Sequence, residues 1–359
     1  MPNSKNKIAI ISHSLGNGGA ERFAGILSLM LTDLGYEIHH IIINDSVDYT
    51  FGGNLYNLGT ETAQLGRFKR KIQKGILFKK YLNTHQINTI IDNRTHPIFL
   101  REVMAKYIFG NRKLIVVVHS FHIQSYLPNW AIFAKFLYGQ SQLVCVSKAI
   151  EKTIRSKYHF KNVTTIYNPI APKLTVEPII NQNRYILFFG RLDEKVKNFN
   201  LMIESFVLSK VFENGFKLMI MGEGPDESFI QKLIVDYGMV EFIQIIPFQK
   251  EPFEFVKNAY FTILTSYYEG FPLAIIESLA CGIPVVAVDC ESGPSEIITN
   301  KYNGLLVPNH NAEALSESIK LFVQDVNLYD ICKKNTIKSI EHLSPAIIAK
   351  QWQEILEKP

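Results

Sequence analysis

The chain has 359 residues, of which 47% are hydrophobic and 20% are charged. This is longer than one hydrophobic core usually serves, so we expect two domains of an ordinary well-packed protein. The four cysteines form no C-x-x-C pair, which argues against a zinc site or a disulfide framework and favours a reducing cytoplasm. We expect neither a signal peptide nor a membrane-spanning segment, because the N-terminus is polar and the apolar runs are short.

The net charge of +5 conceals an asymmetry between the two halves of the chain. Residues 1–175 carry 22 basic and 9 acidic side chains, whereas residues 176–359 carry 16 and 24. A basic half of this kind suggests contact with something anionic, such as nucleic acid, a phospholipid surface or an anionic acceptor.

The first half alternates short apolar runs with helical patterns. Lys7–Ser12 is an apolar run, a glycine-rich loop follows, and apolar residues recur with helical spacing from Ala20 to Leu34. This predicts a strand, a glycine loop and an amphipathic helix closed by Gly35. Further strands are predicted at Ile38–Ile43, Thr89–Asp92, Leu114–His119, Leu143–Ser147 and Val163–Tyr167. The alternation predicts a parallel, doubly wound sheet.

A segment with three prolines and no periodicity, residues 168–183, precedes a second α/β run. We therefore expect an N-terminal domain over residues 1–170, a linker over 171–183 and a second domain over 184–343. Strands are predicted at Tyr185–Phe189, Lys217–Met221, Ile243–Pro247, Thr262–Thr265, Val285–Val288 and Gly304–Val307. Helices are predicted between them at Asn200–Ser209, Asp226–Tyr237, Pro252–Asn258, Pro272–Cys281 and Ala312–Val323, with a last helix at Pro345–Leu356. The two sheets should bind ligands at the carboxyl ends of their strands, facing each other across a cleft.

The strongest local signal is the segment E-G-F-P-L-A-I-I-E, which places Glu269 in a loop and Glu277 inside the following helix. Pro272 suits the first turn of that helix, whose free backbone N–H groups could bind a phosphate. The carboxylates could then accept hydrogen bonds from sugar hydroxyls. Glu277 could instead be a solvated helix residue, but its neighbours are nearly all apolar.

Two basic residues follow the strand Tyr185–Phe189. Arg191 comes directly after Gly190, and Lys197 lies six residues further on. Cations at a strand end suit a diphosphate, with arginine able to bind it in a bidentate manner. Lys195 and Lys197 could equally be surface residues of a loop.

The loop from Gly16 to Arg22 contains Gly18 and Gly19 ahead of a helix, so a ligand phosphate or sugar could approach its backbone. It departs from G-x-G-x-x-G, and Asp45 could be taken for the ribose-binding acid of that motif. The loop alone is an ambiguous nucleotide signal.

Together these pieces resemble the retaining glycosyltransferases of family 4, which have the GT-B architecture of two Rossmann-like domains. The matching segments span almost the whole chain and are most specific in the second half. They are GGAER at Gly18–Arg22, VHS at Val118–Ser120, VCVSKAI at Val144–Ile150, YNPI at Tyr167–Ile170, FGRL with KN over Phe189–Asn198, MGEGP at Met221–Pro225, E-x7-E at Glu269–Glu277, CGIPVVA at Cys281–Ala287, GPSEII at Gly293–Ile298 and NGLLVP at Asn303–Pro308.

The resemblance implies roles for individual residues. Arg191 and Lys197 match the pair that grips the donor diphosphate, Glu277 the carboxylate that binds the ribose, and Glu269 the one that faces the transferred sugar. His119 matches a histidine that contacts the sugar, although it could be a core histidine and His122 is a competitor. The loop positions that match donor-binding residues are Gly18, Gly19, Gly190, Gly270, Phe271, Pro272 and Leu273. Many relatives have glycine at the position of Asn198. The match to the family pattern is therefore weaker around Lys197 than around Arg191.

The implied activity is transfer of a hexose or N-acetylhexosamine, with retention, from a UDP-sugar to a glycan or lipid-linked acceptor in surface polysaccharide synthesis. GDP is the alternative carrier, and no other cofactor is expected. No D-x-D motif is present, so we predict no obligatory metal, with cations and amides meeting the charge of the leaving diphosphate. The resemblance also implies that residues 344–359 form a helix crossing back to the first domain. A sugar-nucleotide epimerase or an inactive binding-only relative are the alternative functions.

Residues 67–80 hold seven basic side chains, with Phe68, Ile72, Ile76 and Leu77 between them. A basic amphipathic helix of this kind binds anionic membrane surfaces, which would place the protein peripherally on the inner face of the plasma membrane. The alternative is a solvated helix whose Ile72 and Ile76 face the core. No nucleic-acid motif is present, so we expect no nucleic acid partner.

Overall fold

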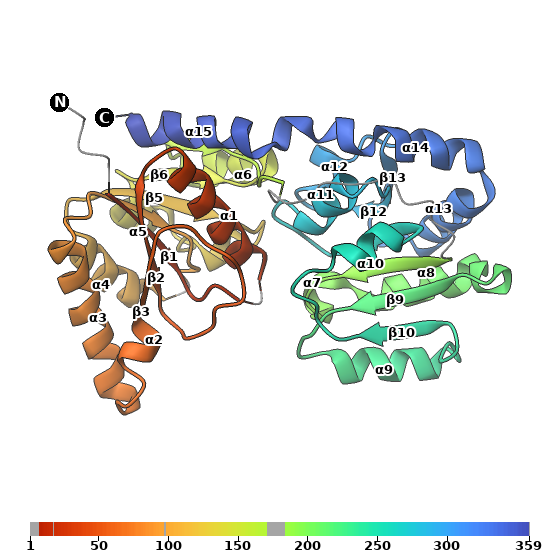
Figure 1. The fold of residues 1–359 in the computed structure, drawn as a ribbon, viewed down its shortest axis with the longest axis horizontal. Helices are drawn as coiled ribbons and strands as arrows, with labels where there is room; N and C mark the ends of the chain where they lie inside the picture. The colour runs from red at the N-terminus through yellow and green to blue at the C-terminus, as the bar shows by residue number, and fades with distance from the viewer. Residues whose placement is uncertain (1–6, 17, 97, 171–183, 359) are drawn as a thin grey trace. The chain divides into compact units, whose positions relative to one another are not determined.

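The computed structural model describes residues 7–16, 18–96, 98–170 and 184–358. The chain divides into two compact units, one formed by Met1–Pro169 with Pro345–Pro359 and the other by Ile170–Ser344. The predicted linker over residues 171–183 lies outside the described residues. Each unit is a parallel sheet with helices packed against it (Figure 1), as the alternation of strands and helices predicts.

The sheet of the first unit has seven strands in the order β3-β2-β1-β4-β5-β6-β7. Their bounds are β1 Lys7–Ser12, β2 Glu37–Ile42, β3 Asn54–Asn57, β4 Thr89–Asp92, β5 Lys113–Val118, β6 Gln142–Cys145 and β7 Val163–Thr165. Every pairing is parallel, with Ile10 opposite His40 on one side and Ile91 on the other. The order reverses at β1, so the crevice for a ligand lies between the carboxyl ends of β1 and β4.

The helices of this unit are α1 Gly19–Asp33, α2 Leu58–Glu61, α3 Arg67–Thr84, α4 Phe99–Phe109, α5 Ala131–Tyr138, α6 Lys148–Tyr158 and α15 Pro345–Glu357, with a 3-10 turn at Ile123–Ser125. Phe78 of α3 and Phe109 of α4 pack in one cluster with Ala9 and Ile11 of β1. On α15, the ring of the fully buried Trp352 is tilted against the ring of Phe23 on α1, with 6.1 Å between the ring centres. The last helix is thereby part of the core of the first unit.

The sheet of the second unit has six parallel strands in the order β10-β9-β8-β11-β12-β13. Their bounds are β8 Tyr185–Phe189, β9 Lys217–Met221, β10 Ile243–Ile246, β11 Phe261–Leu264, β12 Val285–Asp289 and β13 Gly304–Pro308. This is the strand order of dinucleotide-binding domains, with the reversal between β8 and β11.

The helices of the second unit are α7 Glu194–Lys197, α8 Phe199–Ser209, α9 Glu227–Asp236, α10 Phe253–Asn258, α11 Leu273–Ala280, α12 Pro294–Ile297, α13 Ala312–Gln324 and α14 Val326–Ser339, with 3-10 turns at Val211–Asn214 and Glu341–Leu343. Phe199 and Phe206 of α8 join Phe322 of α13 and Phe261 of β11 in the main core.

The cysteines of both units, Cys145, Cys281, Cys290 and Cys332, are free and buried.

Two expectations need correction. Pro272 is the N-cap of α11, one residue before the helical turn in which it was expected. Ile72 and Ile76 are 49% and 56% exposed, so the alternative that they face the core is wrong. Of the helices that the structure describes, none is long and apolar enough to cross a bilayer.

Candidate functional site

The first group of predicted residues lies at the carboxyl end of β8, where two loops approach each other closely. A Cβ atom added at Gly222, which follows β9, would lie 1.8 Å from the carbonyl oxygen of Gly190. Gly224 is equally constrained, since its Cβ would meet the carbonyl oxygen of Leu192 at 2.2 Å. These two glycines let the loop after β9 support the loop that presents Arg191, whose side chain is exposed.

Lys197 ends the short helix α7, directly before Asn198. Asn198 adopts a left-handed conformation, with φ 55°, and its side chain accepts a hydrogen bond from Leu201 N–H at the start of α8. Asparagine is the residue other than glycine that best tolerates this conformation. The departure from glycine at position 198 therefore leaves the local backbone intact.

Lys197 and Glu269 are brought together by the loop after β11. Lys197 Nζ lies 2.6 Å from Glu269 Oε1, and Ser266 Oγ donates to the same oxygen at 2.6 Å. Thr265 fixes the loop against α7 by donating to the carbonyl of Lys197 at 2.8 Å. A carboxylate and an ammonium thus lie beside the strand-order reversal of the second sheet, where ligands bind in such folds.

The loop from Gly270 to Leu273 is held by the segment after β12. Ser292 Oγ donates to the carbonyl of Gly270 at 2.7 Å, and Gly293 lies so close to Pro272 that an added Cβ would be 2.5 Å from its Cδ. Gly293 also has φ 101°, which favours glycine. The side chain of Phe271 is only 3% exposed, so this loop presents mainly backbone. Gly293 opens a matching segment and Ser292 directly precedes it, but no role was predicted for either residue.

Glu277 lies in the second turn of α11 and is only 3% exposed. Its helix begins at the loop that carries Glu269, so the two carboxylates of the E-x7-E segment belong to one structural unit. The N–H groups of Leu273 and Ala274 lie in the first turn of α11, ahead of that of Ile275, which donates to the carbonyl of Pro272 at 3.1 Å.

In the first unit, Gly18 and Gly19 form the start of α1. Gly18 is the N-cap in an extended conformation, and Gly19 is the exposed first residue of the helix. Asp45, by contrast, accepts a hydrogen bond from Asn57 at 2.7 Å near the edge of the sheet. It lies in the loop after β2, where the neighbouring Ser46 carbonyl accepts a hydrogen bond from Leu15 N–H in the loop after β1 at 2.9 Å.

His119 follows β5 and is half-buried, with its ring 4.9 Å from that of Phe23. Its Nε2 atom is hydrogen-bonded to Oδ1 of Asn93, which follows β4. Asn93 in turn donates to the carbonyl of Ala20 in the first turn of α1 at 2.6 Å. Burial lowers the pKa of His119 to about 3, so the imidazole is neutral at physiological pH.

Sequence reasoning missed Asn93, although its place directly after a predicted strand could have indicated it. His122 is exposed and hydrogen-bonded to Ser125.

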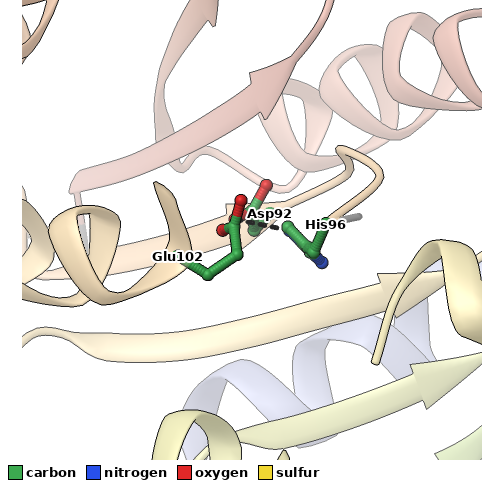
Figure 2. Close-up of side chains that lie close together, drawn as sticks. All are labelled: Asp92, His96 and Glu102. Carbon is green, nitrogen blue, oxygen red and sulfur yellow. Dashed lines mark hydrogen bonds and ion pairs between the residues drawn. The ribbon is translucent and has the colours of Figure 1, made fainter. Parts of the chain in front are cut away.

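A second buried cluster lies beside Asn93. Asp92, His96 and Glu102 bring together potential metal ligands (Figure 2), all within 4.8 Å. Arg94 already serves both carboxylates, at 2.8 and 2.7 Å from the oxygens of Asp92 and 3.4 Å from Glu102. Burial alone would raise the pKa of Asp92, but Arg94 and His96 outweigh burial and hold that pKa well below its usual range. We interpret the cluster as an ion-pair network that fixes the loop after β4.

Two family models match consecutive parts of the chain. The description "Glycosyltransferase Family 4" matches residues 17–174, and "Glycosyl transferases group 1" matches residues 173–339. Together they cover nearly all of the described chain.

Two of the curated relatives match over nearly their full length. The chain is 29% identical over 342 residues to a Campylobacter jejuni N-acetylgalactosamine-N,N'-diacetylbacillosaminyl-diphospho-undecaprenol 4-alpha-N-acetylgalactosaminyltransferase, covering 90% of this chain and 91% of that protein. It is 24% identical to the amylovoran biosynthesis glycosyltransferase AmsD of Erwinia amylovora, covering 98% and 99%. A shorter match, 29% identical over 58% of this chain and 42% of the relative, is to a Staphylococcus aureus poly(ribitol-phosphate) alpha-N-acetylglucosaminyltransferase.

Solved structures share the fold at low identity. A variant of S. aureus TarM in complex with fondaparinux, alpha-GlcNAc-glycerol and UDP has a TM-score of 0.80 at 15% identity, covering 98% of this chain and all of that one. Anabaena HepE in complex with UDP and glucose has a TM-score of 0.81 at 16% identity, covering 98% and 99%. With both family models and these relatives in agreement, the chain belongs to the family 4, group 1 glycosyltransferases and is an enzyme with the GT-B architecture.

Proposed function

We propose that this enzyme transfers a hexose or N-acetylhexosamine from a UDP-sugar to a glycan or lipid-linked acceptor in the synthesis of a surface polysaccharide. The observation that carries the proposal is the Lys197–Glu269 pair at the strand-order reversal of the second sheet, together with the exposed Arg191 in the loop after β8. UDP as carrier is supported by the solved complexes of similar proteins, and the acceptor class by the names of the relatives. GDP remains the alternative carrier.

In this proposal Arg191 and Lys197 hold the donor diphosphate and meet the negative charge that grows on it as the glycosidic bond breaks. Backbone N–H groups at the start of α11 and in the Gly270–Leu273 loop add to this charge stabilisation. The reaction then needs no metal ion. Addition of a strong chelator should leave turnover unchanged, and a loss restored by Mg²⁺ or Mn²⁺ would contradict this part of the proposal.

Glu269 is assigned to the hydroxyls of the transferred sugar, with His119 contacting the same sugar from the first unit. Oε1 of Glu269 already accepts hydrogen bonds from Lys197 and Ser266, an arrangement that weakens it as a nucleophile. We therefore favour retention by attack on the same face within an ion pair over a covalent glycosyl-enzyme. The alpha linkages in the names of two relatives agree with retention from an alpha-linked donor.

Glu277 is assigned to the ribose hydroxyls of the donor, with Gly18, Gly19 and Gly190 as further donor-binding positions. The direct test is a thermal-shift titration of the wild type and Glu277→Ala with UDP, GDP, ADP and their sugar conjugates. A ligand that binds only the folded state raises the melting temperature progressively as its concentration increases above its Kd. We expect UDP compounds to stabilise the wild type and to have a much smaller effect on the variant.

Product analysis completes the test. Incubation with UDP-sugar and no acceptor should leave the sugar configuration unchanged, and conversion to an epimer would favour an epimerase instead. Stabilisation by UDP with no transfer to any glycan or polyprenyl-diphosphate-linked acceptor would favour a binding-only relative.

We further propose that the enzyme is cytoplasmic and works on the inner face of the plasma membrane, supported by the basic helix α3.

A further inference from the structure

The outer faces of α4 and α5 expose an unusual set of large apolar side chains. Six of them, each more than half exposed, are defined here as the apolar patch: Leu100, Met104, Tyr107, Trp130, Ile132 and Phe136. On α4 the exposed residues recur with helical spacing, whereas Ala105 and Phe109 of the same helix are buried. Helix α4 thus has apolar side chains on two faces, and only the face with Ala105 and Phe109 packs in the core.

The patch adjoins further apolar side chains on three helices of the first unit. Phe99 of α4 and Phe133 of α5 bring their rings to 5.0 Å. Lys79 of α3 lies 3.8 Å from the ring centre of Tyr107 on α4. α3 and α4 lie side by side (Figure 1), and the exposed Phe68, Ile72 and Ile76 extend the apolar surface along α3.

The exposed charges on the three helices and on the segments that join them have one sign. Residues 62–150, which contain all three helices, hold 14 lysines and arginines but only two carboxylates, Asp92 and Glu102. Both carboxylates are buried, at 1% and 3% exposure, and both contact Arg94. The exposed charges of this whole segment are therefore positive.

We propose that α3, α4 and α5 form one surface that binds an anionic lipid bilayer, with the apolar patch entering the interface and the lysines at its rim contacting headgroups. Large apolar side chains surrounded by lysines fit a lipid surface of opposite charge. Tyrosine and tryptophan favour the boundary between headgroups and acyl chains. Lys79 over Tyr107 and Lys106 over Phe136 place ammonium groups beside the aromatic rings, from which they can reach outward.

This surface deepens the proposed function, because it gives the enzyme access to an acceptor anchored in the membrane. It shifts the main contact from the basic helix α3 alone to the apolar side chains of α4 and α5. The inference can be tested without donor or acceptor, so its failure is separate from failure of the proposed transfer reaction.

Tryptophan fluorescence gives a local readout, because the chain has two tryptophans and Trp352 is fully buried. Vesicles of phosphatidylglycerol and phosphatidylcholine should shift the emission of Trp130 to shorter wavelength and shield it from acrylamide. Vesicles of phosphatidylcholine alone should have a much smaller effect. No shift with anionic vesicles at low salt would overturn the proposal.

Matched variants separate insertion from simple charge attraction. Leu100→Glu and Ile132→Glu should each weaken vesicle binding about tenfold or more, since each removes a large apolar side chain and adds a repelled charge. The control is Val235→Glu on α9 of the second unit, which is 63% exposed and should bind vesicles like the wild type. Stabilisation by UDP should be equal in all four proteins. Two results would overturn the proposal. One is vesicle binding by the patch variants that equals that of the wild type. The other is a shift of the Trp130 emission without lipid in a protein that sediments as a dimer, because the patch would then be covered by a second copy of the chain.

Discussion

Arg191 is the residue whose substitution should separate folding from chemistry most cleanly. Its side chain is exposed, so Arg191→Ala should change the free energy of unfolding by no more than about 0.5 kcal/mol. Removing a group that stabilises charge in the transition state typically lowers turnover by a factor of about 10² to 10³. We expect a loss of that size in the rate of sugar transfer, measured at saturating donor, with an unchanged urea midpoint. Near-normal turnover would refute the diphosphate assignment.

Lys197 and Lys195 offer a matched pair two residues apart on α7. Lys197 is partly buried against Glu269, whereas Lys195 is exposed. Lys197→Ala should therefore lower transfer strongly, both by losing a cation at the diphosphate and by releasing Glu269 from its ion pair. Lys195→Ala should stay within about twofold of the wild type, because an exposed charge is screened by solvent. Equal effects of the two substitutions would mean that only general positive charge matters.

At the scale of the element, the junction of α7 and α8 depends on the left-handed backbone of Asn198. Asn198→Gly should keep both stability and activity, because glycine adopts this conformation freely. Asn198→Val should cost about 1–2 kcal/mol of stability and displace Lys197, since a β-branched residue is strained there. Urea denaturation and transfer rates of the two variants test this together. A stable, active valine variant would show that the junction tolerates another backbone.

Strand β2 carries a buried histidine that should make the stability of the first unit depend on pH. Neither ring nitrogen of His40 has a hydrogen-bond partner among the described residues, and burial lowers its pKa from 6.5 to about 4. Between those pH values the unfolded chain binds a proton that the folded chain does not, so stability falls as the pH drops from 6.5 towards 4. The loss from this residue is roughly 2 kcal/mol at pH 5.

His40→Leu should remove that loss, so its gain in stability over the wild type should be larger at pH 5 than at pH 8. Urea midpoints at the two pH values give the comparison. The exposed His122 provides the control, and His122→Leu should show no such difference between pH values. A gain for His40→Leu that is equal at both pH values would mean that packing, not protonation, decides the effect.

The elements that could be predicted from the sequence are those whose pattern of apolar residues fits only one type of secondary structure. All the predicted strands are present, and their ends differ from the predicted ones by at most two residues, because buried parallel strands are short unbroken apolar runs. The edge strand Asn54–Asn57 was missed because an edge strand is half exposed and mixes polar with apolar residues. The apolar residues of α3 could not reveal which face is buried, since the core uses only Phe78 and Leu82 near its end.

The candidate site divides in the same way. Arg191, Lys197 and Glu269 could be predicted because strand ends and glycine loops are visible in sequence. The strand-end position of Asn93 is visible in the same way, but its contacts are not, because its partners His119 and Ala20 come from distant segments that only the parallel sheet brings together. The pairing of Gly293 with Pro272 likewise depends on loops after two neighbouring strands.

At the scale of the whole molecule, the charge asymmetry between the halves predicts how salt should act on the enzyme. The basic side chains lie largely in residues 1–175, and the acidic excess lies in residues 176–359. Attraction between exposed charges and a lipid surface is screened over a Debye length of about 10 Å at 0.1 M salt and about 3 Å at 1 M. Diphosphate binding in a partly buried site is screened much less.

Raising the salt concentration should therefore slow transfer to an acceptor embedded in anionic vesicles far more than transfer to a water-soluble analogue of the same acceptor. The two rates, measured at the same donor concentration across a sodium chloride series, form their own control, because the chemistry and the donor site are shared. Ile132→Glu should lower the vesicle rate even at low salt and leave the soluble rate unchanged, since Ile132 is not one of the proposed donor-binding residues. Parallel salt curves for the two acceptors would mean that salt acts on the donor site and that the positive surface has no part in reaching the acceptor.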